Sequence, residues 1–188
     1  MIFKPFYELK NRHAFFSPSK HTWIHWDKEK IINSWKNYRA AERGTELHEF
    51  AEKAIKLGLK LQDSKSTLGM YVNDAIEYRM TPEVALYYSD NCFGHADALC
   101  FRRKTLRIFD LKTGLVTPGS MDQLLIYAAL YCFTYDVDPK SIKYDLRIYQ
   151  FDQAVCYKPT GDEIAEIMDI IVENDAIVEM LKGENLNG

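Results

Sequence analysis

The spacing of the apolar residues changes along this 188-residue chain, and that change restricts its fold more than any other feature. Between residues 47 and 61, apolar side chains recur at the three- and four-residue spacing of an amphipathic helix. From residue 84 the pattern changes to short runs rich in β-branched and aromatic residues, which is typical of strands. The predicted strands are 84–89, 93–101 and 105–112. The chain therefore combines helices with a sheet.

Further helices and one more strand follow. Two capping boxes, Ser120 to Gln123 and Thr160 to Glu163, mark helix starts. Three adjacent strands, followed after a helix by one more, predict an α/β fold with a mixed central sheet flanked by helices. No linker rich in Gly, Ser or Pro divides the chain, so one domain over 1–188 is expected. The predicted helices cover 27–39, 44–61, 70–79, 120–135 and 160–181, and the fourth strand covers 144–151.

Composition is that of a globular protein, with 47% apolar and 27% charged residues. The formal net charge of −3 argues mildly against a protein that coats DNA, although basic residues cluster at 102–107 and 53–60. The four cysteines contain no C-x-x-C pair, so reduced thiols in a cytoplasmic protein are expected. The start shows no signal-peptide pattern, and the longest apolar stretch, 124–133, is too short to span a bilayer. No membrane partner is therefore expected.

Two aspartates and a lysine carry the clearest chemical signal. Strand alternation places Asp110 and Lys112 on the same face. A turn of two or four residues around Arg103 and Lys104 pairs positions whose numbers sum to 207, which sets Asp97 opposite Asp110. The same register sets residue 95 opposite residue 112. Like charges directly opposite destabilise a sheet, and Mg²⁺ or Mn²⁺ between the carboxylates would relieve this. Such a set can cleave phosphodiesters, whereas the alternative is a hairpin with ordinary surface charges.

Five short motifs stand in order along residues 16–151. The motifs are Phe16-Ser17-Pro18-Ser19, Gly44-Thr45-Glu46-Leu47-His48, Gly94-His95-Ala96-Asp97, Ile108-Phe109-Asp110-Leu111-Lys112-Thr113-Gly114 and Gln123-Leu124-Leu125-Ile126-Tyr127. With these motifs the sequence resembles the RecB-like branch of the PD-(D/E)XK nucleases, a branch that includes many phage exonucleases and CRISPR-associated nucleases. The resemblance implies a restriction-endonuclease-like core and a metal-dependent deoxyribonuclease. It also implies an exonuclease that acts in DNA recombination, repair or phage DNA processing, in the cytoplasm of a bacterial cell or phage-infected host.

The resemblance also implies a role for each site residue. Asp97 and Asp110 would bind Mg²⁺ or Mn²⁺. His48 and the main-chain carbonyl of Leu111 would be further metal ligands. Lys112 would act on the attacking water. Two helical side chains, Gln123 and Tyr127, would support the site or touch DNA.

Plainer alternatives stay open for several of these residues. His48 can be a helix-flank histidine with a hydrogen bond, Gln123 can serve only its capping box, and Tyr127 can belong to the core. Glu49 and Glu52 have no assigned role beyond the surface. His48 to Glu52 superficially matches the H-E-x-x-H helix of zinc peptidases, but the second histidine is missing.

The sequence also departs from some relatives. Residues 19–26 contain no cysteine and only Cys156 lies late, so no iron–sulfur cluster is expected. Helicase motifs are missing, so any helicase or recombination partner would be a separate protein. The alternative function is a catalytically silent nuclease-fold module that binds DNA or a protein. Exonuclease or endonuclease action, polarity, strand preference and oligomeric state do not follow from the sequence.

Overall fold

The computed structural model describes residues 14–114 and 120–185. The chain divides into two compact units, residues 1–45 and residues 46–188, and each is described by itself. The predicted single domain over 1–188 stays a prediction. The sheet and all of the chemically distinctive residues discussed below lie in the second unit.

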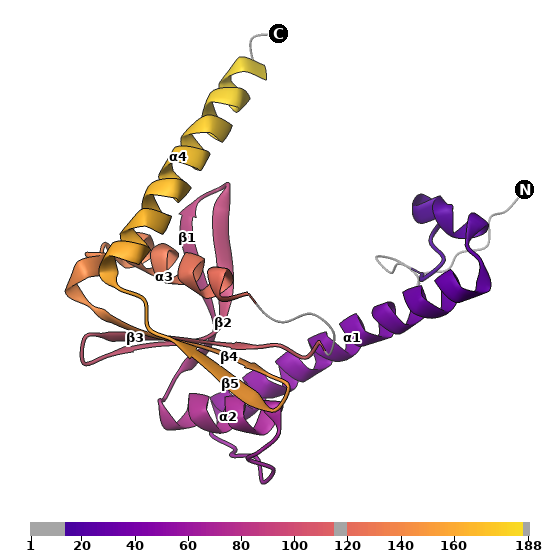
Figure 1. Cartoon of the computed structure of the whole chain (residues 1–188), viewed down its shortest axis with the longest axis horizontal. Helices are drawn as coiled ribbons and strands as arrows, with labels where there is room; N and C mark the ends of the chain where they lie inside the picture. Colours follow the sequence, from indigo (N-terminus) through magenta and orange to yellow (C-terminus); the bar gives the residue numbers. More distant parts are fainter. Residues whose placement is uncertain (1–13, 115–119, 186–188) are drawn as a thin grey trace, which may run out of the picture. The chain divides into compact units, whose positions relative to one another are not determined.

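The second unit is built on a five-stranded mixed sheet. Its strands are β1 (Thr81–Ser89), β2 (Cys92–Arg102), β3 (Thr105–Leu111), β4 (Lys143–Gln150) and β5 (Gln153–Tyr157). They lie in chain order across the sheet (Figure 1). Neighbouring strands are antiparallel except β3 and β4, which are parallel. The α/β class and the mixed sheet predicted from the sequence are thus confirmed.

The α-helices are α1 (Lys28–Leu57), α2 (Thr67–Glu77), α3 (Met121–Tyr135) and α4 (Gly161–Asn185), and the short 3-10 helices are η2 (Pro18–His25) and η3 (Pro139–Ser141). Within the second unit, α2 with the end of α1 covers one face of the sheet, and α3 with α4 covers the other. Because strand side chains alternate, β3 supplies Leu106 and Ile108 to the core under α3 and α4, and Phe109 and Leu111 to the core under α2 and the end of α1. Every helix in the described ranges is too short or too polar to cross a lipid bilayer.

Aromatic side chains organise the first unit. The ring of Phe15 lies with its centroid 5.1 Å from that of Trp35 and 5.4 Å from that of Tyr38, both on α1. The indole N–H of Trp23 donates to the carbonyl of Ser17 at 2.9 Å, and Ser17 is buried. The Ser17–Ser19 motif therefore has a local structural role, because it ties η2 to the segment before it.

Two predicted helix starts are confirmed by their caps. The Asp27 carboxylate accepts the N–H of Lys30 at 2.7 Å. At the start of α4, the N–H of Thr160 donates to Glu163 at 2.8 Å and the N–H of Glu163 donates to the Thr160 hydroxyl at 3.2 Å. These reciprocal bonds are the capping box that the sequence predicts.

Two features differ from the sequence prediction. The separate helices at 27–39 and 44–61 are one continuous helix, α1. Gly44 costs such a helix only about 1 kcal/mol, and good helix formers surround it. The strand β5 was not expected, because all five of its residues are exposed and leave no alternating pattern. Its turn uses Phe151 and Asp152 at positive φ, 54° and 52°, where glycine or asparagine is the usual signal.

Candidate metal centre

The hairpin between β2 and β3 has the predicted register. Its turn consists of Arg103 and Lys104, both in the left-handed region at φ 51° and 58°. The last pair of the ladder is Ala98 with Phe109, so the next level sets Asp97 opposite Asp110. At this level β2 leaves the ladder, and the carboxylate of Asp97 accepts the N–H of Leu111 at 2.9 Å. The ladder pairs end here, so the expected pairing of residues 95 and 112 does not form.

A third carboxylate, that of Glu83, stands on the same level. Pro82 pairs with Ala98 and Val84 with Ala96, which sets Glu83 on β1 opposite Asp97 on β2. Glu83 has φ 53°, an uncommon conformation for a residue with a side chain and one that costs about 1–3 kcal/mol. The acids of three neighbouring strands, Glu83, Asp97 and Asp110, therefore form one row across the sheet.

Sequence reasoning missed Glu83 because of a β-bulge. The tip of the β1–β2 hairpin pairs Ser89 with Cys92, but the next pair is Tyr87 with Phe93. This shift moves the register by one residue, and without it Val84 would stand opposite Asp97. The available signal was Glu83 itself, an acidic residue that stands between Pro82 and the predicted start of the strand at residue 84. In the structure the strand already begins at Thr81, so it includes Glu83.

His48 joins the row of acids from helix α1. Its Nδ1 lies 3.4 Å from Oδ2 of Asp97. One ligand atom from each of His48, Glu83 and Asp97 lies within 4.8 Å of the other two. This spacing suits three groups that surround one cation, and it explains why a histidine on the flank of α1 is turned toward the sheet.

Asp110 and Lys112 form the other half of the site. Nζ of Lys112 lies 3.0 Å from Oδ2 and 3.2 Å from Oδ1 of Asp110, but only Oδ1 has hydrogen-bond geometry. The same ammonium donates to Oε1 of Gln123 at 2.7 Å. Asp110 is 2% exposed, and its buried Oδ2 accepts no hydrogen bond from the described residues. An oxygen in that state can take a cation.

Gln123 of helix α3 holds Lys112, and Tyr127 of the same helix lies next to Gln123. Gln123 does not complete its predicted capping box, since its carbonyl oxygen accepts from Lys112 and its amide lies 3.5 Å from the Tyr127 hydroxyl. The Tyr127 ring packs so closely on Gly94 that a Cβ there would lie 3.0 Å from it. The glycine of the G-x-x-D motif and the tyrosine of the helical motif are thus one packing contact.

Burial makes the row of acids electrostatically unfavourable. Burial, followed by the charge of Asp110, raises the pKa of Asp97 to about 6, although His48 and the Leu111 N–H lower it. Burial and the charges of Asp97 and Asp110 also raise the pKa of the Tyr71 hydroxyl. Tyr71 is therefore a neutral neighbour of the aspartates.

The donor set fits a hard divalent cation. The three carboxylates and the ammonium of Lys112 carry a formal charge of −2, which a divalent ion would balance. Carboxylate oxygens with one imidazole are ligands that Mn²⁺ accepts, and Mg²⁺ binds to carboxylates and water. Oδ2 of Asp110 accepts no hydrogen bond from the described residues, although the Lys112 ammonium lies 3.0 Å away, so this oxygen is available as a metal ligand.

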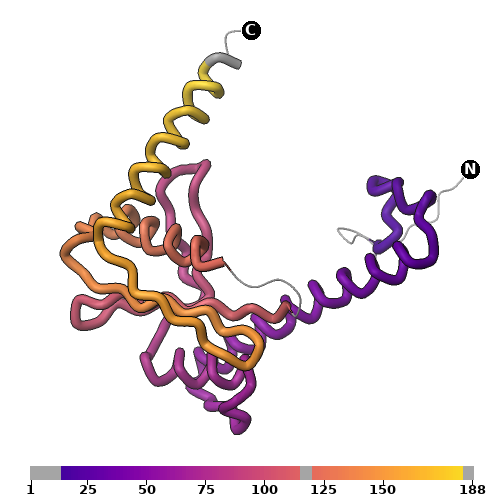
Figure 2. Tube along the Cα trace, in the orientation of Figure 1, coloured from indigo at the N-terminus to yellow at the C-terminus, as the bar shows by residue number. Residues whose placement is uncertain are grey.

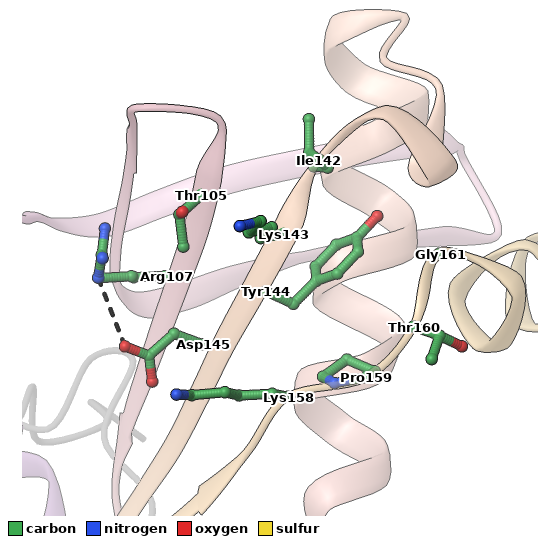
Figure 3. A pocket seen from close by; sticks show the side chains of 10 residues that line it. All are labelled: Thr105, Arg107, Ile142, Lys143, Tyr144, Asp145, Lys158, Pro159, Thr160 and Gly161. Atoms are coloured by element: carbon green, nitrogen blue, oxygen red, sulfur yellow. Dashed lines mark ion pairs between the residues drawn. The ribbon is translucent and has the colours of Figure 1, made fainter.

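Other candidate residues lie in ordinary surroundings. Glu49 and Glu52 form ion pairs along α1 with Lys53 and Lys56, at 3.8 Å and 2.5 Å. A cavity of about 440 Å³ lies at the other end of β3, lined in part by Arg107, and contains none of the predicted site residues (Figure 3). The acids and the cavity are therefore separate features.

Comparison with protein-family models and with curated protein sequences gives no match. The family and the activity of this chain therefore depend on the geometry of the site and on the resemblance of its motifs.

Proposed function

We propose that this chain is a metal-dependent deoxyribonuclease of the PD-(D/E)XK superfamily, with its active site at Asp97, Asp110 and Lys112. One observation carries the proposal. Carboxylates from β1, β2 and β3 stand on one level of the sheet, and Lys112 follows Asp110 by two residues. The arrangement brings like charges together, although like charges directly opposite each other destabilise a sheet. One of the carboxylates, that of Asp110, also has an oxygen that accepts no hydrogen bond from the described residues.

The fold supports the proposal. The resemblance to PD-(D/E)XK nucleases implies a core with a mixed central sheet flanked by helices. Here β2 and β3 form an antiparallel hairpin that carries Asp97 and Asp110, and β4 lies parallel to β3 after helix α3 (Figure 2). Helix α3 also supplies Gln123, which contacts Lys112.

Each residue then has a defined task. Asp97, Asp110 and Glu83 would hold Mg²⁺ or Mn²⁺, with His48 and the Leu111 carbonyl as further ligands. The bound ion would supply a water of lowered pKa and a counter-charge for the phosphate. Lys112, held between Asp110 and Gln123, would orient the attacking water and donate a hydrogen bond to the developing charge.

The proposal predicts metal-dependent cleavage by the purified chain. End-labelled linear and closed circular DNA, single- and double-stranded, are incubated with Mg²⁺, with Mn²⁺ and with chelator. We expect degradation with either metal and none with chelator. Digestion of linear but not circular DNA identifies an exonuclease. A DNA-binding protein that never cleaves would instead support the catalytically silent module.

Two substitutions make this test specific. Asp110→Asn keeps the shape of the side chain and removes the charge beside Lys112, so cleavage is expected to fall to background. Glu49→Gln is the matched control, because Glu49 is an exposed acid next to His48 that pairs with Lys53. Equal loss of cleavage in both variants would contradict the assignment of this site.

A further inference from the structure

The β1–β2 hairpin has an exposed face that continues from the row of acids. Side chains alternate along its strands, so Leu86 and Ala96 enter the core while Tyr87, Phe93 and His95 face outward. Tyr87 is 51% and Phe93 is 61% exposed, although each is a large aromatic side chain. They form a cross-strand pair with ring centroids 6.4 Å apart and planes 28° from parallel. The two rings therefore present an aromatic surface to solvent.

This aromatic surface is held rigidly. The Tyr87 hydroxyl donates to Asp90 at 3.0 Å, which fixes the ring. The backbone of Tyr87 exchanges two bonds with Thr134 of α3, at 2.9 Å and 3.0 Å. At the hairpin tip, Ser89 bonds to Asp175 of α4, which lies beside the projecting end of the hairpin (Figure 1). The Tyr87 ring and the hairpin are therefore held in place before any ligand arrives, and Phe93 lies beside that ring, which lowers the entropy cost of binding.

The two rings and the acids lie on the same face, at a defined separation. Glu83 and Asp97 form one level of the hairpin, Ala85 and His95 the next pair on that face, and Tyr87 and Phe93 the pair after it. Four residues of strand separate the first level from the third, a distance of about 13 Å. This distance spans a few nucleotides of an extended chain, and the small side chain of Ala85 leaves the path between them open.

We infer that this face binds single-stranded nucleic acid, with a base stacked on Tyr87 and Phe93 while the sugar–phosphate chain runs past His95 to the row of acids. The inference rests on the proposed nuclease function and specifies its substrate class. An exposed aromatic pair stacks on any base, because every base has a π-face. Bases in a duplex are already stacked on each other, so the pair favours a single-stranded end.

The charges near the rings favour stacking over phosphate contacts. Asp90 accepts a hydrogen bond from the Tyr87 hydroxyl. Asp175 and Glu179 of α4 lie at the hairpin tip, where both accept hydrogen bonds from the side-chain amide of Asn91. These acids repel phosphates, so the chain would enter along the His95 side, where an imidazole N–H can donate to a phosphate oxygen. The base, which carries no charge, is the part that reaches the rings.

Binding is measured apart from cleavage. The Lys112→Ala variant serves as the background, and fluorescence anisotropy with Mn²⁺ follows a labelled ten-residue oligothymidylate and an abasic oligonucleotide of equal length. Adding Tyr87→Ala and Phe93→Ala is expected to weaken oligothymidylate binding roughly tenfold or more. The abasic chain, which has no base to stack, is expected to lose little. Equal binding of oligothymidylate with and without both rings would overturn the inference.

Matched variants separate stacking from folding and from other partners. Tyr87→Phe with Phe93→Tyr keeps both rings and is expected to keep binding, while Phe101→Ala removes an exposed ring at the far end of β2 and is expected to have no effect. Sedimentation tests for self-association through this face. If the rings hold two copies together and do not affect oligonucleotide binding, the inference is wrong and the nuclease proposal stands. If the parent chain neither binds nor cleaves any polynucleotide, both fail.

Discussion

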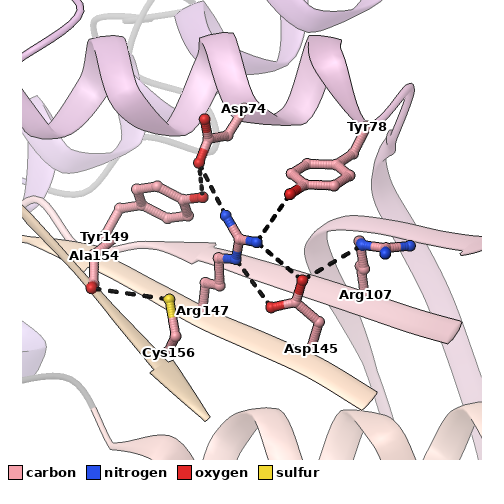
Figure 4. Close-up of polar contacts among 8 residues, drawn as sticks. All are labelled: Asp74, Tyr78, Arg107, Asp145, Arg147, Tyr149, Ala154 and Cys156. Atoms are coloured by element: carbon pink, nitrogen blue, oxygen red, sulfur yellow. Dashed lines mark hydrogen bonds and ion pairs between the residues drawn. The ribbon is translucent and has the colours of Figure 1, made fainter. Parts of the chain in front are cut away.

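The molecule holds two groups of acids, each centred on a buried aspartate of the sheet, and the surroundings of the two groups are opposite. Around Asp145, on β4, Arg147 donates from Nε and Nη2 to both carboxylate oxygens at 2.9 Å, and Arg107 lies 3.4 Å away (Figure 4). Arg147 also reaches Asp74 of α2 at 3.2 Å. Around Asp110, on β3, the only cation in contact among the described residues is Lys112.

A count of charges makes the difference plain. The Asp145 group has two aspartates and two arginines and is formally neutral, and its rings add cation–π contacts, with Arg107 4.8 Å and Arg147 5.0 Å from the centre of Tyr78. The row of acids has three carboxylates against one lysine, with Asp110 buried, Asp97 partly buried and Glu83 exposed. A folded protein neutralises buried charge where its role is structural. An excess of −2 in one place therefore indicates a site that needs a cation from outside.

The largest expected effect is on catalysis at Lys112. Lys112→Ala is expected to lower the cleavage rate about 10²–10⁴-fold, because a positioned group that acts on the attacking water contributes that much. Mn²⁺ affinity is expected to stay the same or rise, since an opposing positive charge is removed. Single-turnover cleavage and calorimetric Mn²⁺ titration measure the two quantities. Cleavage at the parental rate would remove Lys112 from the mechanism.

The next effect is on stability at Arg147. Arg147→Met is expected to lower the free energy of unfolding by about 3 kcal/mol, because Asp145 stays buried with one weaker partner. The matched change Lys112→Met also removes the cation beside a buried aspartate, Asp110, so with chelator it is expected to cost a comparable amount. Millimolar Mn²⁺ is expected to recover part of that cost for Lys112→Met, because a bound cation replaces the lost charge, and none of it for Arg147→Met. Urea denaturation with chelator and with Mn²⁺ compares the two variants. The same response to Mn²⁺ in both would mean that the two groups do not differ as the charge count says.

These contrasts also show what the sequence could and could not predict. Asp97 and Asp110 were placed opposite each other because a two-residue turn fixes a register by arithmetic, and Arg103 and Lys104 form that turn. Local rules of this kind need no knowledge of distant contacts.

Features that depend on tertiary contacts were missed. Glu83 stands opposite Asp97 only because a bulge at the hairpin tip shifts the register by one residue, and no local sequence signal marks that bulge. The Asp145 group was not predicted because Asp74 and Arg147 are 73 positions apart and meet only when α2 packs on the sheet. From the sequence, Gln123 can either complete the capping box at the start of its helix or contact the candidate site. Its hydrogen bond with Lys112, which only the folded structure shows, distinguishes the two roles.

A smaller effect is expected on stability at Asp97 without metal. Its pKa is raised to about 6 in the folded chain and is about 3.9 in an unfolded one. The native protein therefore binds more protons than the unfolded chain between about pH 4 and pH 6, and the stability contributed by Asp97 is lost as pH rises through that range. At pH 7 with chelator, Asp97→Asn is expected to gain about 1–2 kcal/mol, below the limit of about 3 kcal/mol set by the pKa shift.

The pH dependence separates this effect from ordinary packing. The gain from Asp97→Asn is expected to disappear below about pH 4, where both proteins carry a neutral group. Asp145→Asn provides the opposite case, because it breaks paired contacts and is expected to destabilise at pH 7. Thermal melts across this pH range, with chelator, measure both. A gain that persists at low pH would show that charge repulsion is not its cause.

The smallest effect distinguishes a ligand from a helix-flank histidine at His48. His48→Ala is expected to weaken Mn²⁺ binding about tenfold and to leave folding nearly unchanged, because His48 is part-exposed and leaves no large cavity. In thermal melts, millimolar Mn²⁺ is expected to raise the melting temperature of the parent by mass action and to do so less for this variant. Glu49→Gln, one residue along α1, controls for a change on that helix and is expected to match the parent. If calorimetry gives the same Mn²⁺ affinity for all three proteins, His48 serves only to bond Asp97, and the cation would be held by Glu83, Asp97 and Asp110 alone.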